Sequence, residues 1–159
     1  MDYPDLGNES QVTSGKGIRA VGWLGYSYKK GRLGKKYVAL LKGQVADAYQ
    51  PFLYRGVHYC GHCNPESPAR GSLNLLIPHK RWLYVAPEMI VHYVEAHGYL
   101  PPREFLDALV ACPPQRSDGY FKLIDRFAKA AVLSESIWPP SNILETAALT
   151  YYNQRAKPH

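Results

Sequence analysis

The spacing of apolar residues changes about halfway along the chain. Before residue 86, short apolar runs alternate with glycine, proline and polar residues, and we expect strands over 18–28 and 52–59. The runs SLNLLI and RWLYVA flank Pro-His-Lys at 78–80, a pattern that predicts a β-hairpin. These strands predict a small antiparallel sheet in the first half of the chain.

Helical spacing dominates the rest of the chain. Apolar residues recur every three or four positions over 35–49, which predicts an amphipathic helix, and the same period returns after residue 86. Pro87 suits the first position of a helix, Gly98 suits a helix end, and Ser117 or Asp118 suits an N-cap. The later helices are expected over 87–97, 102–112, 117–136 and 142–154. The fold class is therefore predicted as α+β, a small antiparallel sheet followed by several packed helices.

The domain organisation follows from length and composition. The chain has 159 residues, enough for one domain with its own core. The polar, glycine-containing stretch 1–17 predicts a flexible arm, and 18–159 is predicted as one domain. No apolar run approaches the ~20 residues of a membrane span, and MDYPDLGNES is unlike a secretory signal. We expect no membrane association and a cytoplasmic location, which the three cysteines also suit.

The segment HYCGHCNPES holds a Cys-x-x-Cys pair, Cys60 and Cys63, with three possible interpretations. Cys-Gly-His-Cys resembles the redox-active tetrapeptide of protein disulfide isomerases, whose first cysteine caps a helix. Pro65 and Pro68, followed by Gly71, disfavour that helix and with it the redox interpretation. A metal knuckle and two ordinary free thiols remain.

The metal interpretation needs two further ligands, and HYVEAH supplies His92 and His97. Two cysteines on a turn and two histidines near a helix end are typical of a Cys2His2 zinc site. Positions five apart diverge by roughly 140° around a regular helix, so both histidines reach one ion only if the helix loosens near Gly98. Otherwise His58 is the alternate ligand. The predicted cofactor is Zn²⁺, bound by Cys60, Cys63, His92 and His97.

One stretch of the chain, from Gly56 to Val110, resembles a family of small uncharacterised bacterial proteins. The shared residues follow the pattern RGxHxCxxC … APxxIxHYVxxHxYxPPxEF, and VGWL at 21–24 also resembles an early motif of the family. The family usually has acidic and aromatic residues between the cysteines, where this chain has Gly61 and His62. The resemblance implies no known activity.

Catalytic motifs are few. HYVEAH is not the His-Glu-x-x-His pattern of zinc proteases, and the order of motifs differs from that of zinc deaminases. Glu88 and Glu95 lie near the histidines in the sequence and are candidates for a catalytic acid or base. Glutamates on an amphipathic helix are, however, usually just exposed to solvent. No phosphate-binding glycine loop or serine elbow stands out. The scarcity of such motifs favours a non-catalytic binding protein, and a zinc-dependent hydrolase is the alternative.

Charge is concentrated near the start of the chain. The net charge is +6, and no acidic residue occurs between Glu9 and Asp47. The segment 16–42 therefore supports a nucleic-acid-binding alternative, with Trp23, Tyr26 and Tyr28 available to stack on bases. Its candidate phosphate-binding residues are Lys29, Lys30, Arg32, Lys35 and Lys36.

Tyrosine and proline are both abundant, with 13 of each, and tyrosine is enriched in binding surfaces. Together with the scarcity of catalytic groups, this favours a zinc-stabilised, non-catalytic binding protein of bacterial type that engages a protein partner, as immunity or regulatory proteins do. Cys112, just before Pro113 at a predicted helix end, is expected to be a small buried residue outside the zinc site.

Overall fold

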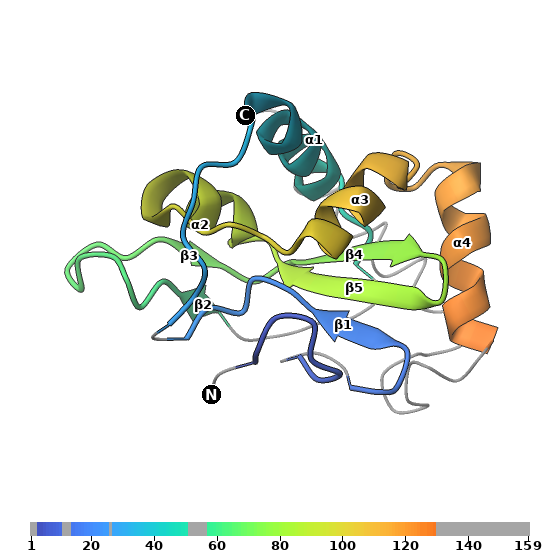
Figure 1. The fold of residues 1–159 in the computed structure, drawn as a ribbon, viewed down its shortest axis with the longest axis horizontal. Helices are drawn as coiled ribbons and strands as arrows, with labels where there is room; N and C mark the ends of the chain where they lie inside the picture. The colour runs from blue at the N-terminus through green and yellow to red at the C-terminus, as the bar shows by residue number, and fades with distance from the viewer. Residues whose placement is uncertain (1–2, 11–13, 26, 51–56, 130–159) are drawn as a thin grey trace, which may run out of the picture.

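A three-stranded sheet built on a β-hairpin forms the centre of the molecule (Figure 1). The computed structural model describes residues 3–10, 14–25, 27–50 and 57–129. Strand β4 (Asn74–His79) runs antiparallel to β5 (Trp82–Pro87), and β1 (Ile18–Ala20) pairs in parallel with the other side of β5. The fold class is α+β, as predicted. The parallel β1–β5 pair makes the sheet mixed, and β1 is shorter than the predicted strand over 18–28.

Two prolines take different places from those predicted. The hairpin turns at Lys80–Arg81 rather than over 78–80, because Pro78 belongs to β4 and pairs with Leu83. Strand β4 lies at an edge of the sheet, where a residue without a backbone N–H is tolerated. Pro87 ends β5 instead of starting a helix, and the following helix α2 (Ile90–His97) begins three residues later.

Both faces of the hairpin are buried, so its strands are nearly continuous apolar runs. Successive side chains point to opposite faces and contribute to two separate core clusters. The first cluster contains Leu75, Ile77, Tyr84 and Ala86; the second contains Ile18, Ala20, Leu76, Leu83 and Val85. The sheet is therefore the middle layer of the fold.

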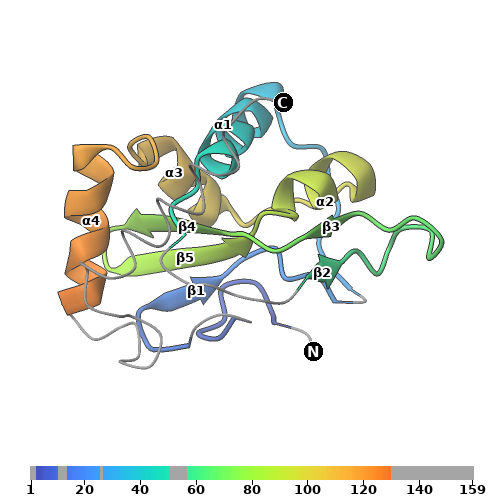
Figure 2. The same cartoon turned by 180° about the vertical axis from the view of Figure 1, so that it is seen from behind.

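Helices cover the sheet unevenly. Helices α1 (Lys35–Ala46), α2 and α3 (Arg103–Ala111) lie on one side of the sheet, and α4 (Asp118–Lys129) crosses beside the hairpin turn (Figures 1 and 2). Helix α4 buries Tyr120, Ile124 and Phe127 against the second cluster. Within this helix Tyr120 is fully buried, whereas its neighbour Phe121 is half-buried.

Capping of α4 agrees with the sequence. The Ser117 hydroxyl accepts a hydrogen bond from the Tyr120 N–H at 3.2 Å, which confirms Ser117 as the residue that caps this helix. The predicted helix 142–154 lies outside the described residues, as does most of the predicted strand 52–59. Among the helices that are described, none is both long and apolar enough to cross a membrane.

A second, two-stranded sheet lies at the end of the molecule opposite α4 (Figures 1 and 2). Strand β2 (His58–Tyr59) pairs antiparallel with β3 (Arg70–Gly71) over two register positions. The segment between these strands contains Cys60 and Cys63. This short sheet therefore places the cysteine pair beside α2.

Residues before β1 contact the sheet. The Leu6 N–H donates to the Ala20 carbonyl at 2.7 Å, and the Asp5 carboxylate accepts hydrogen bonds from the Tyr99 hydroxyl and the Gly22 N–H. Burial raises the pKa of Asp5 despite these donors. The contact between Asp5 and Tyr99 joins the start of the chain to the segment just after α2.

Candidate metal centre

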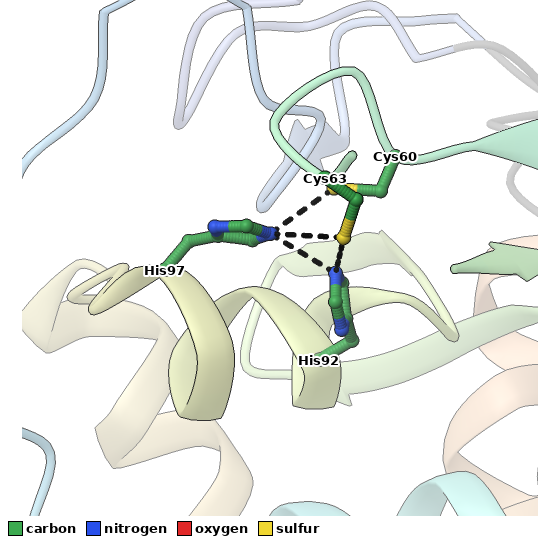
Figure 3. A group of neighbouring side chains, drawn as sticks. All are labelled: Cys60, Cys63, His92 and His97. Carbon is green, nitrogen blue, oxygen red and sulfur yellow. Dashed lines mark hydrogen bonds between the residues drawn. The ribbon is translucent and has the colours of Figure 1, made fainter. Parts of the chain in front are cut away.

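Four side chains of the metal-ligating type converge between the β2–β3 segment and α2. Cys60 and Cys63 come from the turn after β2, and His92 and His97 come from α2 (Figure 3). One ligand atom from each residue lies within 4.8 Å of the other three. Within the described part of the chain, this is the one group of its kind, and it could hold a metal ion. These are the four residues that the spacing singled out.

The distances between donor atoms suit one tetrahedral ion. The two Nε2 atoms are 3.1 Å apart, and three sulfur–nitrogen distances are 3.2 Å, 3.3 Å and 3.5 Å. A tetrahedral zinc with Zn–N of ~2.05 Å and Zn–S of ~2.3 Å separates its nitrogens by about 3.3 Å and a nitrogen from a sulfur by about 3.6 Å. The cluster therefore has nearly the size of a zinc coordination shell.

The end of α2 explains how two histidines five positions apart reach the same point. Gly98 adopts a left-handed conformation with φ of 63°, and its N–H donates to the Tyr93 carbonyl. This bond spans five residues rather than the four of an α-helix, so the last turn is wider. His97 consequently turns back toward His92, and Figure 3 shows both imidazoles pointing at Cys63. The loosening expected near Gly98 is present.

The turn of the cysteine pair is held by its own backbone. The Cys60 N–H donates to the Ala69 carbonyl across the small sheet at 2.8 Å. Burial raises the pKa of the Cys60 thiol, while hydrogen bonds from the backbone N–H groups of His62 and Cys63 oppose that rise. These N–H groups are placed to stabilise a thiolate, the form of cysteine that binds a metal.

Burial also affects the two histidines. It lowers the pKa of His92 and of His97, and the neighbouring His92 lowers that of His97 further. Lower pKa values favour the neutral imidazoles that coordinate metals.

His58, the alternate ligand, lies outside the cluster. Its Nε2 lies 2.8 Å from the hydroxyl oxygen of Tyr93, and its pKa is lowered mainly by burial. His58 is thus engaged by α2 without joining the four donors. Sequence reasoning missed Tyr93 as this partner, because the position next to His92 gives no signal of it.

Tyr28 is a second contact that spacing did not reveal. Its hydroxyl donates to the His97 carbonyl at 3.2 Å, and its ring lies edge-on to His62, with centroids 5.2 Å apart. His62 itself is exposed and is not one of the four donors. Tyr28 therefore covers one side of the cluster.

The proposed base-stacking residues are partly wrong. Trp23 is only 6% exposed, and its indole N–H donates to the Val85 carbonyl at 3.0 Å, so it cannot stack on a base. Tyr28 faces the cluster, and Tyr26 lies outside the described residues. The predicted phosphate-binding residues all lie on exposed parts of the loop before α1 or in its first turn: Lys29, Lys30, Arg32, Lys35 and Lys36.

Cys112, the third cysteine, ends α3 and is half-buried rather than fully buried. Burial raises its pKa to about 12. Cys112 is not a member of the four-donor group.

Comparison with known proteins places the chain in a family without adding an activity. No curated protein and no solved structure matches it. One family model matches residues 1–110, which include the sheet, α1, α2 and all four members of the cluster. The chain therefore belongs to the family described as a domain of unknown function, DUF7919.

Proposed function

We propose that this chain is a zinc-stabilised, non-catalytic binding protein whose ion is held by Cys60, Cys63, His92 and His97. The observation that carries the proposal is the convergence of two sulfurs and two imidazole nitrogens within 4.8 Å. Tetrahedral sites made of two thiolates and two imidazoles favour Zn²⁺ over the harder cations, which prefer oxygen. The ion would join the β2–β3 segment to α2.

A structural role is favoured over a catalytic one by the number of donors. Four protein ligands complete a tetrahedron and leave no position for a reactive water. The nearby carboxylates have other partners, a weak surface ion pair for Glu95 and backbone donors for Glu88. Glu95 pairs with Lys42 at 2.6 Å, and Glu88 accepts hydrogen bonds from the backbone N–H groups of Ser72 and Leu73. Neither carboxylate contacts the four donors, which supports a binding protein over a hydrolase.

A protein partner is favoured over a nucleic acid by the surface next to the cluster. Val57 and Tyr59 are 50% and 53% exposed, and both lie at β2 just before Cys60. Exposed apolar and tyrosine side chains on an ion-fixed segment suit a protein interface of the regulatory or immunity kind. The burial of Trp23 removes one of the stacking groups that the nucleic-acid alternative requires.

Elemental analysis tests the metal. Chain purified without added metal should contain one zinc per molecule, and His97→Ala should lose most of it. His62→Ala is the matched control, because His62 neighbours His97 without belonging to the cluster, and it should keep the zinc. A chain that contains no metal, or that keeps its zinc in His97→Ala, would refute the proposed site.

A further inference from the structure

A groove lies between the segment 31–35, α1 and α2. Its volume is about 610 Å³, within the ~300–1,000 Å³ typical of ligand pockets. The wall from α2 includes Val94 and Glu95, which lie between the two histidines of the cluster in the sequence, and Gly98, which follows them. The groove and the cluster therefore share one helix.

The charges around this groove are mainly positive. Arg32, Lys35 and Lys42 line it, against the single carboxylate of Glu95. Glu95 and Lys42 pair with each other, but their side chains are 47% and 52% exposed, so the pair is weak and open to exchange. A carboxylate of a bound ligand would therefore meet three cationic side chains, and it could replace Glu95 as the partner of Lys42.

The floor of this groove is apolar. Leu33 and Val94 are 9% and 8% exposed, and Val38 is half-buried. The lining contains no aromatic side chain on which a base could stack. A nucleic acid would gain only phosphate contacts here, whereas an acidic peptide with an apolar side chain would also cover the floor.

We propose that this groove binds a short acidic segment of a protein partner, with an apolar side chain between its carboxylates. The proposal rests on the function inferred above and specifies the chemistry of the partner. The carboxylates contact Arg32, Lys35 and Lys42, and the apolar side chain lies on Leu33 and Val94.

The groove is linked to the cluster through backbone contacts. The Gly31 N–H donates to the Gly98 carbonyl and the Leu100 N–H to the Lys29 carbonyl, each at 2.9 Å. A side chain at Gly31 would meet Leu100 at 2.8 Å, so the two segments are closely packed. The wall of the groove is thus tied to the residues that directly follow His97. Loss of the ion should therefore weaken peptide binding.

The experiment is a selection of random 12-residue peptides on the zinc-loaded full chain, followed by fluorescence anisotropy of the enriched peptides. We expect enriched sequences to carry at least two acidic residues and an apolar one, and their affinity to fall as salt rises. Enriched peptides without acidic residues would overturn the proposal. If a labelled single-stranded RNA binds more tightly than the enriched peptides, and Arg32→Glu/Lys35→Glu abolishes that binding, the proposal is overturned in favour of a nucleic acid.

Three variants locate the binding. The double variant Arg32→Glu/Lys35→Glu should lower the affinity for the peptide roughly tenfold or more, because two exposed attractive charges become repulsive ones. Glu95→Gln should strengthen binding about two- to threefold, since it removes the like charge. The charge-matched control is Lys122→Glu/Arg126→Glu, which alters the net charge equally on the exposed surface of α4 and should leave the peptide affinity unchanged. Equal losses in the double variant and the control would overturn the proposal, and thermal melts check that each variant folds.

The two proposals can fail separately. Zinc in the protein together with charge-independent peptide binding would retain the metal site and reject the groove. Charge-dependent binding by a chain that contains no metal would retain the groove and reject the zinc.

Discussion

The two ends of the molecule are built by different means. Near α4, the β4–β5 hairpin is buried on both faces, and Leu75, Leu76, Ile77, Leu83 and Val85 have no exposed surface. At the opposite end, β2 and β3 pair over two positions each, and most residues between them are exposed. The first end is held mainly by apolar burial, supplemented by the hydrogen bonds of the hairpin and of α4. The second buries too little to be held that way, and a metal ion would supply what burial does not.

The largest expected effect is loss of the ion. Structural zinc contributes on the order of 10 kcal/mol of apparent free energy, comparable with the ~5–15 kcal/mol that stabilises a typical domain. Cys60→Ser or Cys63→Ser should therefore cost most of the free energy of unfolding, measured by thermal or urea denaturation. Cys112→Ser, outside the cluster, should cost about 1 kcal/mol or less. Small and equal shifts in all three variants would contradict the comparison.

A core substitution near α4 should destabilise the β4–β5 hairpin and leave the four-donor cluster intact. Leu83→Ala removes a fully buried side chain from the second cluster and should cost roughly 2–5 kcal/mol in urea unfolding. Its zinc affinity, measured by competition with a chromophoric chelator, should equal that of the unmodified chain. A marked fall in affinity would show that the two ends are not independent.

Glu88 connects the segment after β3 with the start of α2. Its carboxylate accepts hydrogen bonds from two backbone N–H groups, of Ser72 and Leu73. Glu88→Ala leaves both donors without this acceptor and should cost about 1–3 kcal/mol in chemical denaturation. Glu88→Gln keeps an acceptor oxygen and should cost less. If both variants lose the same free energy of unfolding, the negative charge of Glu88 rather than its hydrogen bonds stabilises this segment.

The smallest expected effect is at Gly98. Its φ of 63° is strained for alanine, so Gly98→Ala should cost about 1 kcal/mol of stability. It should also lower zinc affinity, because the widened turn positions His97. Gly43→Ala is the control: Gly43 lies within α1 with nothing within 4 Å of an added Cβ, so alanine should add roughly 0.5–1 kcal/mol. Unchanged zinc affinity in Gly98→Ala would mean that the turn does not position His97.

Local signals predicted much of the fold. The hairpin, the helix predicted over 35–49 and observed at Lys35–Ala46, the stop at Gly98 and the cap at Ser117 each depend on residues close together in the sequence. The parallel pairing of β1 with β5 joins residues about 65 positions apart, and no spacing rule reports it. Pro78 was misplaced for a related reason, because only the whole sheet shows that β4 is an edge strand.

The cluster was predictable in its members and not in its geometry. Cys-x-x-Cys and a later histidine pair are visible in the sequence, so the four residues could be named from spacing. The wider last turn of α2 is set by the Gly98 conformation, which a regular-helix calculation leaves out. The role of Tyr93 as the partner of His58 depends on the packing of β2 against α2 and has no sequence signature.

The order of the four donors along the chain has a consequence for folding. The cysteines precede the histidines they contact by 29 to 37 residues, and the β4–β5 hairpin occupies much of that interval. Because a hairpin forms from neighbouring residues, it draws the flanking segments together early and shortens the loop that remains to be closed. During synthesis the thiols leave the ribosome well before the imidazoles. Capture of an ion by all four donors would therefore be a late step, completed only after α2 has emerged.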